Sequence, residues 1–465
     1  MVFKKTLVYT IPSDKNFARI GRCGGSSKGG EKWPPVKLIT IAGVARTYSN
    51  TWFLDGDNEG IKEKEFKKRF IEIRPDLAIS EPLPTLLEKE IETLDEIKKV
   101  YDFKVVFIGS FASAEAENIL KKYQNVDYII EGEPETALIK LYANETRIKG
   151  VWKRKGKEIS YYGKEKLLED LDKLPLPTHD LLKPVYRAPF VKNRLFTVVE
   201  SSRGCPYPCT FCNAGLMNGK KVRYKSPKRI VEELKFIKSV GINEVIFNDE
   251  TFALNRKRTI ELMKRITGEK LNLKWVCSSR VDTIDDEVIW LMKKAGCRTI
   301  LFGVESGCQE ILDYYKKGIK LEQIENAFKL AHKYNIETVA HFMFGAPMES
   351  AETIRRTVEF AKKVNPTLVS FNILTPYPGT KIFEDFNRRK LILTREWSAL
   401  DQSQATVIET EHLSNDELEK YMKWAYKKFY YRPKYALERI SRIKSIYDLK
   451  KTIVGFWALL KITRG

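Results

Sequence analysis

The stretch that decides how this chain is interpreted is Ser201-Ser202-Arg203-Gly204-Cys205-Pro206-Tyr207-Pro208-Cys209-Thr210-Phe211-Cys212. It follows the apolar run Leu195–Val199, so it is predicted to form the loop that leaves a β-strand. Its three cysteines are spaced so that their thiolates can close around one face of an iron–sulfur cubane. A four-iron cluster ordinarily takes four thiolates. Because the loop offers three, one iron would stay open to a substrate, much as a catalytic zinc ion keeps one open position.

Other uses of these thiols fit the sequence less well. A zinc site would need a fourth Cys or His nearby, and His179 lies 26 residues before Cys205. A disulfide fits less still, because seven cysteines in 465 residues are too few for a stapled secreted scaffold. We therefore expect reduced thiols and a cytosolic protein. The other cysteines, which show no partner spacing and are not expected to bind the cluster, are Cys23, Cys277, Cys297 and Cys308.

The motif, C-x3-C-x2-C with the aromatic Phe211 directly before its last cysteine, resembles the signature of the radical S-adenosylmethionine (SAM) superfamily. The resemblance implies that Cys205, Cys209 and Cys212 bind a 4Fe–4S cluster, with SAM chelated at the open iron and contacting Phe211. It also implies an enzyme whose cluster takes one electron from a ferredoxin- or flavodoxin-like donor. Cleavage of the sulfonium would give a 5′-deoxyadenosyl radical that abstracts hydrogen from an unactivated carbon.

A repeating strand–helix pattern surrounds this loop. The strand-like runs, which are separated by helical periodicity, cover residues 195–201, 244–249, 273–280, 299–306, 337–347 and 367–376. Six such units fit a partial (β/α)6 barrel over residues 193–390, the architecture of the superfamily that the motif resembles. In barrels of this kind the chemistry lies at the carboxyl ends of the strands.

Polar or small residues stand at those strand ends, and the resemblance implies a role in SAM binding for four of them. Glu250, where the superfamily usually carries Gly-Gly-Glu, would accept a bond from the methionyl ammonium. Arg280 would meet the methionyl carboxylate as a two-pronged donor. Glu305 would accept the ribose hydroxyls, and Gly345 would permit close approach of the adenine. No catalytic residue is assigned, and His341 is given no proton-transfer role.

Residues 1–145 alternate between strands and helices, with strand-like runs at Leu7–Ile11, Thr51–Leu54, Leu77–Ser80, Lys104–Ile108 and Tyr128–Ile130. Apolar strands that alternate with helices predict a doubly wound, Rossmann-like parallel sheet. Its ligand should bind beyond the carboxyl ends of the strands. Because no G-x-G-x-x-G follows a strand, a dinucleotide is disfavoured.

The succession of strand ends resembles the cobalamin-binding domain that precedes the barrel in many radical SAM enzymes. The residues that this resemblance assigns to cobalamin are Asp55, Ser80, Glu81, Gly109, Ser110, Glu131 and Gly132. Well-known cobalamin domains offer a histidine in Asp-x-His-x-x-Gly, whereas here no histidine precedes His179. Cobalamin is therefore expected to bind without a histidine axial ligand. A Rossmann-like domain that has lost its cofactor, or binds only substrate, remains the alternative.

Two further regions are predicted. Residues 146–192 are expected to form a linker, with a stiff break at Leu174–Pro177. Residues 391–465 are expected to be helical, and the stretch Tyr421–Tyr435 mixes aromatic rings with cations. Such a segment suits an anionic membrane interface, a helical cap over the barrel, or single-stranded nucleic acid. These interpretations stay open at the level of sequence.

The composition narrows the class of protein. Lys and Arg number 82 against 61 Asp and Glu, for a formal net charge of +21, and 43% of the residues are hydrophobic. The chain is therefore neither disordered nor a membrane-embedded bundle, since no apolar segment reaches the ~18 to 20 residues that span a bilayer. A basic protein of this kind can meet nucleic acid, an anionic membrane surface or acidic substrates.

Three functions are compatible with these features. The favoured one is a cobalamin-type radical SAM enzyme that forms a carbon–carbon bond on an archaeal tetraether membrane lipid, by ring closure, coupling or methylation. The alternatives are a cobalamin-dependent methyltransferase acting on a non-lipid small molecule or RNA, and a non-catalytic iron–sulfur scaffold. A tRNA methylthiotransferase is disfavoured, because those enzymes carry three further cluster cysteines where this chain has Cys23 alone. We expect no stable nucleic-acid partner, and a cytoplasmic protein at the inner face of the cell membrane.

Overall fold

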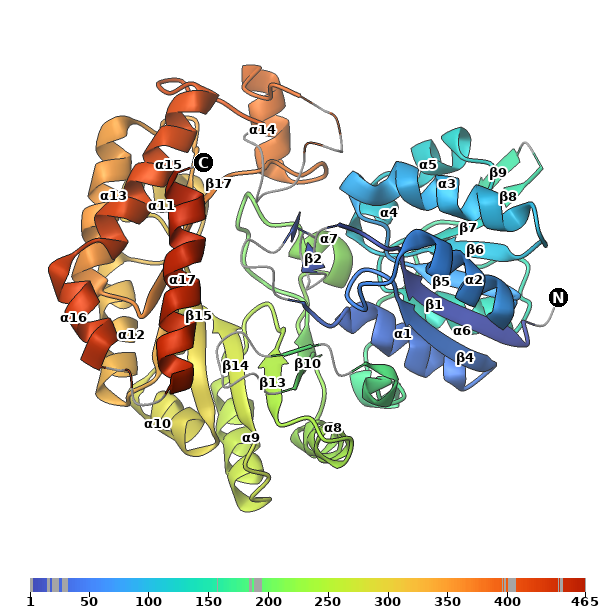
Figure 1. The fold of residues 1–465 in the computed structure, drawn as a ribbon, viewed down its shortest axis with the longest axis horizontal. Helices are drawn as coiled ribbons and strands as arrows, with labels where there is room; N and C mark the ends of the chain where they lie inside the picture. Colours follow the sequence, from blue (N-terminus) through green and yellow to red (C-terminus); the bar gives the residue numbers. More distant parts are fainter. Residues whose placement is uncertain are drawn as a thin grey trace.

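The computed structural model describes residues 3–14, 17–18, 25–26, 32–156, 158–183, 186–187, 195–394, 396, 399, 407–441, 443 and 446–464. Within these ranges the chain forms two main β-sheets, each packed with helices, followed by further helices (Figure 1). We call the first sheet with its helices the first unit, on the right of Figure 1, and the second the barrel. Cys23 lies outside the described residues.

The first unit contains a seven-stranded sheet in the order β4-β1-β5-β6-β7-β8-β9. Its first five strands are parallel: β4 (Asn50–Asp55), β1 (Lys5–Thr10), β5 (Leu77–Ser80), β6 (Lys104–Phe107) and β7 (Tyr128–Ile130). The strand order reverses on the two sides of β1. Doubly wound sheets bind ligands at such a switch point, outside the carboxyl ends of the strands.

Both faces of this sheet are buried, which explains its continuous apolar strands. Along β1, Leu7 and Tyr9 pack into one hydrophobic cluster, while Val8 packs into another on the opposite face. The helices that share the first cluster are α2 (Glu63–Ile73), α3 (Leu87–Lys98), α4 (Ser110–Ala114) and α5 (Ala116–Lys122). Those that share the second are α1 (Val36–Arg46) and α6 (Pro134–Tyr142). The predicted Rossmann-like sheet is therefore confirmed.

The predicted linker over residues 146–192 contains two strands of the first sheet instead. β8 (Val151–Lys155) pairs antiparallel with β7, and β9 (Glu158–Tyr161) pairs antiparallel with β8. Trp152 and Tyr161 stack across this hairpin at 4.2 Å between ring centroids. Three consecutive cations, Lys153, Arg154 and Lys155, follow Trp152 in β8, so the segment is polar in sequence although the two rings pack together. The remainder carries only the short turns η2 (Leu171–Lys173) and η3 (His179–Leu181) among its described residues.

The barrel contains six parallel strands in chain order, which confirms the predicted partial (β/α)6 architecture. They are β10 (Phe196–Val199), β13 (Glu244–Phe247), β14 (Lys274–Ser279), β15 (Cys297–Glu305), β16 (Glu337–Phe344) and β17 (Leu368–Ile373). The helices between or after them are α8 (Pro227–Ser239), α9 (Arg256–Gly268), α10 (Asp286–Lys294), α11 (Gln309–Tyr314), α12 (Leu321–Lys333), α13 (Ala351–Val364) and α14 (Lys381–Arg389). Since β10 and β17 are both edge strands, the barrel is open.

The carboxyl-terminal helices cover one of these edges. They are α15 (Asn415–Tyr430), α16 (Pro433–Ser441) and α17 (Ile446–Arg464). The hydroxyl of Tyr426 accepts from Phe371 N and donates to Phe371 O, both at 3.1 Å, and Tyr430 bonds Val369 N and O at 2.9 and 2.8 Å. These bonds satisfy backbone groups of β17 that an edge strand would leave unpaired. The rings of α15 therefore serve as a cap on the barrel.

The structure also bears on membrane insertion. Among the helices in the described ranges, none combines the length and the apolar character that crossing a bilayer requires.

Candidate functional site

The cysteine loop connects β11 (Ser202–Arg203) to α7 (Ala214–Asn218). Backbone hydrogen bonds tie it to three distant segments: Cys205 N donates to Gly219 O at 3.2 Å, Thr210 N to Tyr315 O at 3.0 Å, and Ile382 N to Thr210 O at 3.0 Å. These bonds reach the residues that directly follow α7 and α11 and the first turn of α14, so the loop is fixed along its length rather than at its ends alone.

Gly204 sets the turn directly before the first cysteine. Its φ of +94° is a conformation that side chains rarely adopt. A Cβ at this position would lie 2.3 Å from the backbone oxygen of Lys221. The turn that presents Cys205 therefore requires glycine.

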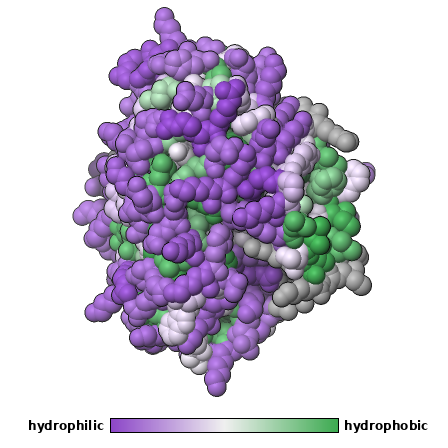
Figure 2. All heavy atoms as spheres, turned by 90° about the vertical axis from the view of Figure 1, so that its left-hand side faces the viewer, coloured by the Kyte–Doolittle hydropathy of each residue, from purple (hydrophilic) through white to green (hydrophobic). Residues whose placement is uncertain are grey.

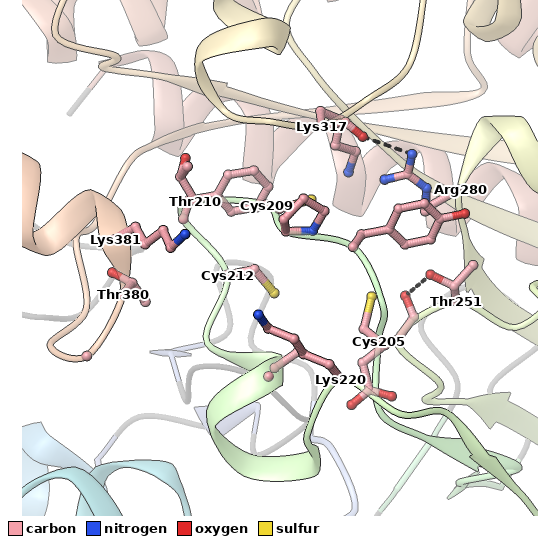
Figure 3. A pocket seen from close by; sticks show the side chains of 17 residues that line it. Cys205, Cys209, Thr210, Cys212, Lys220, Thr251, Arg280, Lys317, Thr380 and Lys381 are labelled. Carbon is pink, nitrogen blue, oxygen red and sulfur yellow. Dashed lines mark hydrogen bonds between the residues drawn. The ribbon is translucent and has the colours of Figure 1, made fainter.

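The loop lines a cavity of about 210 Å³ at the carboxyl ends of the barrel strands. Six of the predicted residues meet there: Cys205, Cys209, Cys212, Phe211, Glu250 and Arg280. Figure 3 shows side chains from the loop and from the neighbouring strand ends around this space. Among the described residues, no three His, Cys, Asp or Glu side chains converge as ligands of a single metal ion. A cubane does not require such convergence, because each cysteine would bind a different iron.

The cavity is cationic. Lys220, Lys317, Lys381 and Arg280 line it, together with the acidic Glu250. In Figure 3 the three amino groups turn toward the cysteine loop from different sides. Burial raises the pKa of Cys209, while Lys317 and Arg280 oppose that effect. A cluster held by three thiolates is anionic and gains a further negative charge on reduction, so these cations suit it.

Arg280 is held in place by its own neighbours. Its Nε and Nη2 donate to the Asp282 carboxylate at 2.9 and 2.8 Å, and Nη2 also donates to Lys317 O at 2.9 Å. The guanidinium lies 3.5 Å from the centroid of the Tyr207 ring. A ligand carboxylate would therefore have to bind at Nη1 or replace Asp282.

Of the remaining residues predicted to bind SAM, one lines the cavity and two do not. Glu250 accepts from Asn218 Nδ2 at 2.6 Å and lines the cavity. Glu305 is absent from the lining, but it forms an ion pair of 2.7 Å with Lys317, which does line it. Gly345 is not brought to this cavity either. Its φ is +109°, and a Cβ there would lie 2.8 Å from Ile408 Cδ1.

Sequence reasoning missed several lining residues. They are Tyr207, Pro208, Thr210, Ala214, Gly215, Lys220, Thr251, Lys317, Gly379, Thr380 and Lys381. Those in 207–215 belong to the cysteine motif or directly follow it, and Gly379 and Thr380 follow the sixth strand-like run. Lys317 belongs to no motif. Its position between α11 and α12 is all that the sequence offers to identify it.

The residues predicted to bind cobalamin form two groups: three whose side chains are bonded within the first unit, and the others, which lie at one edge of it. Asp55 is buried and accepts from Thr10 Oγ1 at 2.5 Å, from Asn58 and from the Tyr186 hydroxyl. Ser80 donates to Glu90. Glu131 accepts from Trp152 Nε1 at 3.0 Å and pairs with Lys164 at 3.2 Å. These three side chains are thus engaged in the structure of the first unit.

The others lie at the edge that faces the barrel. Gly109, at a φ of +100°, packs against the side chain of Glu81, and Ser110 begins α4. Glu81 forms an ion pair of 2.9 Å with the partly buried Lys37. Burial lowers the pKa of Lys37, but Glu81 and Glu200 outweigh it and raise that pKa.

Gly132 links this edge to the cysteine loop. At a φ of +78°, a Cβ on it would come within 4.0 Å of Met217 O in α7. His179, the first histidine of the sequence, is buried between Thr197 and Glu233, with ring nitrogens 2.9 and 3.2 Å from their oxygens. Both ring nitrogens of His179 are therefore already engaged within the fold, so a corrin at this edge would not take its imidazole as a ligand.

A buried ion-pair network joins the first unit to the cysteine loop. Arg203 Nη2 lies 2.7 Å from Glu135 and 3.1 Å from Glu200. Arg223 donates to both oxygens of Glu133, at 2.7 and 2.6 Å. Glu133 and Glu135 stand at the start of α6, whereas Arg203 directly precedes Gly204. The position of the loop is therefore coupled to that of the first sheet.

Known proteins share sequence and fold with this chain. A model of the radical SAM superfamily matches residues 199–361. An uncharacterized methyltransferase of Pyrococcus horikoshii is 32% identical over 422 residues, which cover 88% of this chain and 91% of that protein.

Two further relatives carry more specific names. The anaerobic magnesium-protoporphyrin IX monomethyl ester cyclase of Rubrivivax gelatinosus is 26% identical, covering 78% of this chain and 68% of that protein. The hopanoid C-3 methylase of Methylococcus capsulatus is 29% identical, covering 64% of this chain and 58% of that protein.

Two solved structures share the fold. OxsB, a cobalamin-dependent SAM radical enzyme with aqua-cobalamin and SAM bound, aligns with a TM-score of 0.74 and 16% identity, over 99% of this chain and 72% of its own. TsrM from Kitasatospora setae, a radical SAM methyltransferase with cobalamin and a 4Fe–4S cluster bound, aligns with a TM-score of 0.68 and 18% identity, over 84% of this chain and 78% of its own. The alignment with OxsB extends over both units.

Proposed function

Because this chain belongs to the radical SAM superfamily, we propose that it is a cobalamin-dependent radical SAM enzyme that alkylates an unactivated carbon. One observation carries the proposal: Cys205, Cys209 and Cys212 line the same cationic cavity as Arg280 and Glu250. The name of the Pyrococcus relative and the fold shared with two cobalamin-binding enzymes support a methyl transfer reaction.

In this proposal the side chains bind the cluster and SAM, orient SAM, and balance the charge of the cluster. The three cysteines hold a 4Fe–4S cluster, and Lys317 and Arg280 balance its negative charge. Glu250 receives the ammonium of SAM and Arg280 its carboxylate, while Phe211 packs beside the cofactor. When bound, cluster and SAM supply one-electron cleavage chemistry, and cobalamin supplies methyl transfer. The roles given to Glu305, at the ribose, and Gly345, at the adenine, remain predictions.

We place cobalamin at the edge of the first unit that faces the barrel, where Glu81, Gly109, Ser110 and Gly132 lie. This edge contains the ends of strands beside the switch point of the sheet. Asp55, Ser80 and Glu131 would support it indirectly, because their side chains are already bonded within the unit.

We further propose a lipid substrate, with carbon–carbon bond formation by methylation, ring closure or coupling. The hopanoid methylase among the relatives supports this class of substrate. The second candidate is a non-lipid small molecule, and the cyclase relative, which covers more of this chain, favours a tetrapyrrole there. An archaeal tetraether lipid is the specific lipid that we propose. The enzyme would then work at the inner face of the cell membrane.

The electron donor is proposed to be a ferredoxin- or flavodoxin-like protein. The formal net charge of +21 supports an acidic partner, because complementary charge accelerates association. No stable nucleic-acid partner is expected, since two of the aromatic residues of α15 that resemble a stacking surface, Tyr426 and Tyr430, are bonded to β17 instead.

Anaerobic reconstitution tests the proposal. The protein should bind four iron atoms per cluster, and dithionite with SAM should then release 5′-deoxyadenosine. Cys209→Ala should lose both the cluster absorbance and SAM cleavage, whereas Cys277→Ala, at a buried cysteine of β14, should keep both. An intact cluster without SAM cleavage under several reductants would favour a non-catalytic scaffold. Incubation with hydroxocobalamin followed by gel filtration should retain corrin absorbance, and clean separation would argue against the methyl-carrier role.

A further inference from the structure

The helices α16 and α17 carry exposed apolar side chains that no described part of the chain covers. Figure 2 shows hydrophobic residues gathered on the face of the molecule where the carboxyl-terminal helices lie. We define the apolar strip as Leu437, Ile440, Leu449, Ile453, Phe456 and Trp457, whose exposed fractions run from 46% to 68%. Several large exposed apolar side chains on neighbouring segments of the chain indicate an interaction site.

Four of the six residues of the strip lie on α17 and occupy one side of that helix. Leu449, Ile453, Phe456 and Trp457 recur at helical spacing, which places them on one face. Leu459 and Ile462, on another face of the same helix, pack against the core of the barrel, and Thr463 lies 3.4 Å from the Tyr431 hydroxyl. The helix is thus docked on the barrel by one face and presents the apolar strip on the other.

We propose that the apolar strip docks the protein on an anionic membrane surface, with α17 lying in the plane of the interface. The sequence from 432 to 464 is strongly basic. Its Lys and Arg residues are Arg432, Lys434, Arg439, Arg442, Lys444, Lys450, Lys451, Lys461 and Arg464, and its acidic residues are Glu438 and Asp448. Basic charge beside exposed Leu, Ile, Phe and Trp is the pattern of an interfacial amphipathic helix.

Two other occupants fit this surface less well. A second copy of the chain, paired through the same face, would bring two strongly basic segments together, which like-charge repulsion disfavours. A single-stranded nucleic acid would need a series of exposed rings for its bases, but the strip is mostly aliphatic. An anionic bilayer satisfies both the charge and the aliphatic side chains.

Vesicle binding tests the inference without any turnover, so it succeeds or fails independently of the proposed function. The full-length protein is mixed with vesicles of phosphatidylcholine and phosphatidylglycerol, or of phosphatidylcholine alone, and sedimented. The wild type should bind the anionic vesicles and release them in high salt. A Phe456→Glu/Trp457→Glu variant should bind at least about tenfold more weakly, because it loses apolar contacts and gains negative charge.

The matched control is Val100→Glu/Tyr162→Glu, which changes two exposed hydrophobic residues of the first unit, 61% and 45% exposed, and should bind like the wild type. Far-UV circular dichroism and gel filtration verify that each variant is folded. The inference is overturned if the wild type stays in solution, or if the Phe456/Trp457 variant binds as well as the control. It is also overturned if the wild type is a dimer that this variant dissociates, or if transfer RNA is bound through the strip instead of vesicles.

Discussion

At the scale of single residues, the site depends on side chains that control charge and backbone shape around three cysteines. Lys317 shows this most clearly. Its ammonium lines the cavity, pairs with Glu305 at 2.7 Å and lies 5.8 Å from the centroid of the Phe211 ring. Gly303 lies beside this pair: a Cβ there would come 2.5 Å from a Glu305 oxygen and 2.9 Å from the Lys317 ammonium, so these side chains would have to move. The strand end is thus shaped to bury an ion pair next to the cluster loop.

We expect Lys317→Met to make reduction of the cluster harder. Removing a cation, and leaving Glu305 unpaired, disfavours the more negative reduced state. The reduction potential should fall by roughly 20 to 60 mV, the one-electron equivalent of about 0.5 to 1.5 kcal/mol. A redox titration followed by electron paramagnetic resonance measures it. The neighbouring Lys316 is exposed, so Lys316→Met serves as the control, and equal potentials in both variants would contradict the role of Lys317.

Gly204→Ala should impair cluster binding through backbone geometry alone. Left-handed φ strain costs on the order of 1 to 3 kcal/mol, and the overlap with Lys221 O adds to it. The ratio of iron to protein after reconstitution should therefore fall well below that of the wild type. Gly268→Ala, where nothing lies within 4 Å of the added Cβ, should retain full iron content. Full iron content in both variants would show that the turn is not needed.

At the scale of secondary-structure elements, the edge of the barrel is closed by a helix from outside it. Two tyrosines of α15, Tyr426 and Tyr430, each bond both backbone groups of one residue in β17. Tyr435 adds a bond of 3.1 Å to Thr367 O. Because these hydroxyls replace a missing neighbouring strand, α15 belongs structurally to the barrel.

Tyr426→Phe and Tyr430→Phe should each lower the free energy of unfolding. Each substitution leaves a buried N–H and a buried C=O of β17 without a partner, which costs about 1 to 3 kcal/mol. Urea unfolding followed by circular dichroism measures the change. Tyr421→Phe, at a half-buried ring of the same helix, should change stability by less than about 0.5 kcal/mol. Equal effects from the three substitutions would mean that the hydroxyls do not cap β17.

At the scale of the whole molecule, buried charges hold the two units in register. Arg203 and Arg223 come from the barrel, while Glu133 and Glu135 come from the start of α6. Burial raises the pKa of Glu135, but Arg203 outweighs it and holds that pKa below its ordinary value. A carboxyl with a lowered folded-state pKa stabilises the protein above its unfolded-state pKa and loses this contribution as the pH falls through the lower value.

Arg203→Gln should therefore weaken the contact between the two units, and so lower the stability of the protein, more than a substitution at an exposed ion pair does. Breaking a buried ion pair by removing one partner costs about 3 to 5 kcal/mol. This cost should shrink as the pH falls from the ordinary Glu pKa of about 4.3 through the lower pKa at which Glu135 is protonated in the folded wild type. Urea unfolding at neutral and acidic pH, with limited proteolysis, measures both effects. Arg256→Gln removes an exposed pair instead and should have little effect. A cost that does not change with pH would rule out this role of the Glu135 charge.

The sequence by itself determined the chemistry of the cysteine loop and the order of the strands and helices. Both are local properties. The C-x3-C-x2-C motif lies within a stretch of twelve residues, and apolar periodicity is recognised within each single segment. The predicted places of Glu250 and Arg280 followed from the same logic. Each directly follows a strand-like run of the sequence, and the carboxyl ends of parallel strands share one side of the barrel.

Only the tertiary structure decided which distant residues meet these. Lys317 reaches the cavity, Asp282 holds Arg280, and Glu135 pairs with Arg203 across 68 positions of sequence. The β8–β9 hairpin likewise belongs to the first sheet, although its charged residues make the segment look like a linker in the sequence. Such partners are set by contact between segments that are far apart in the chain, and a periodic pattern within one segment carries no information about its neighbour.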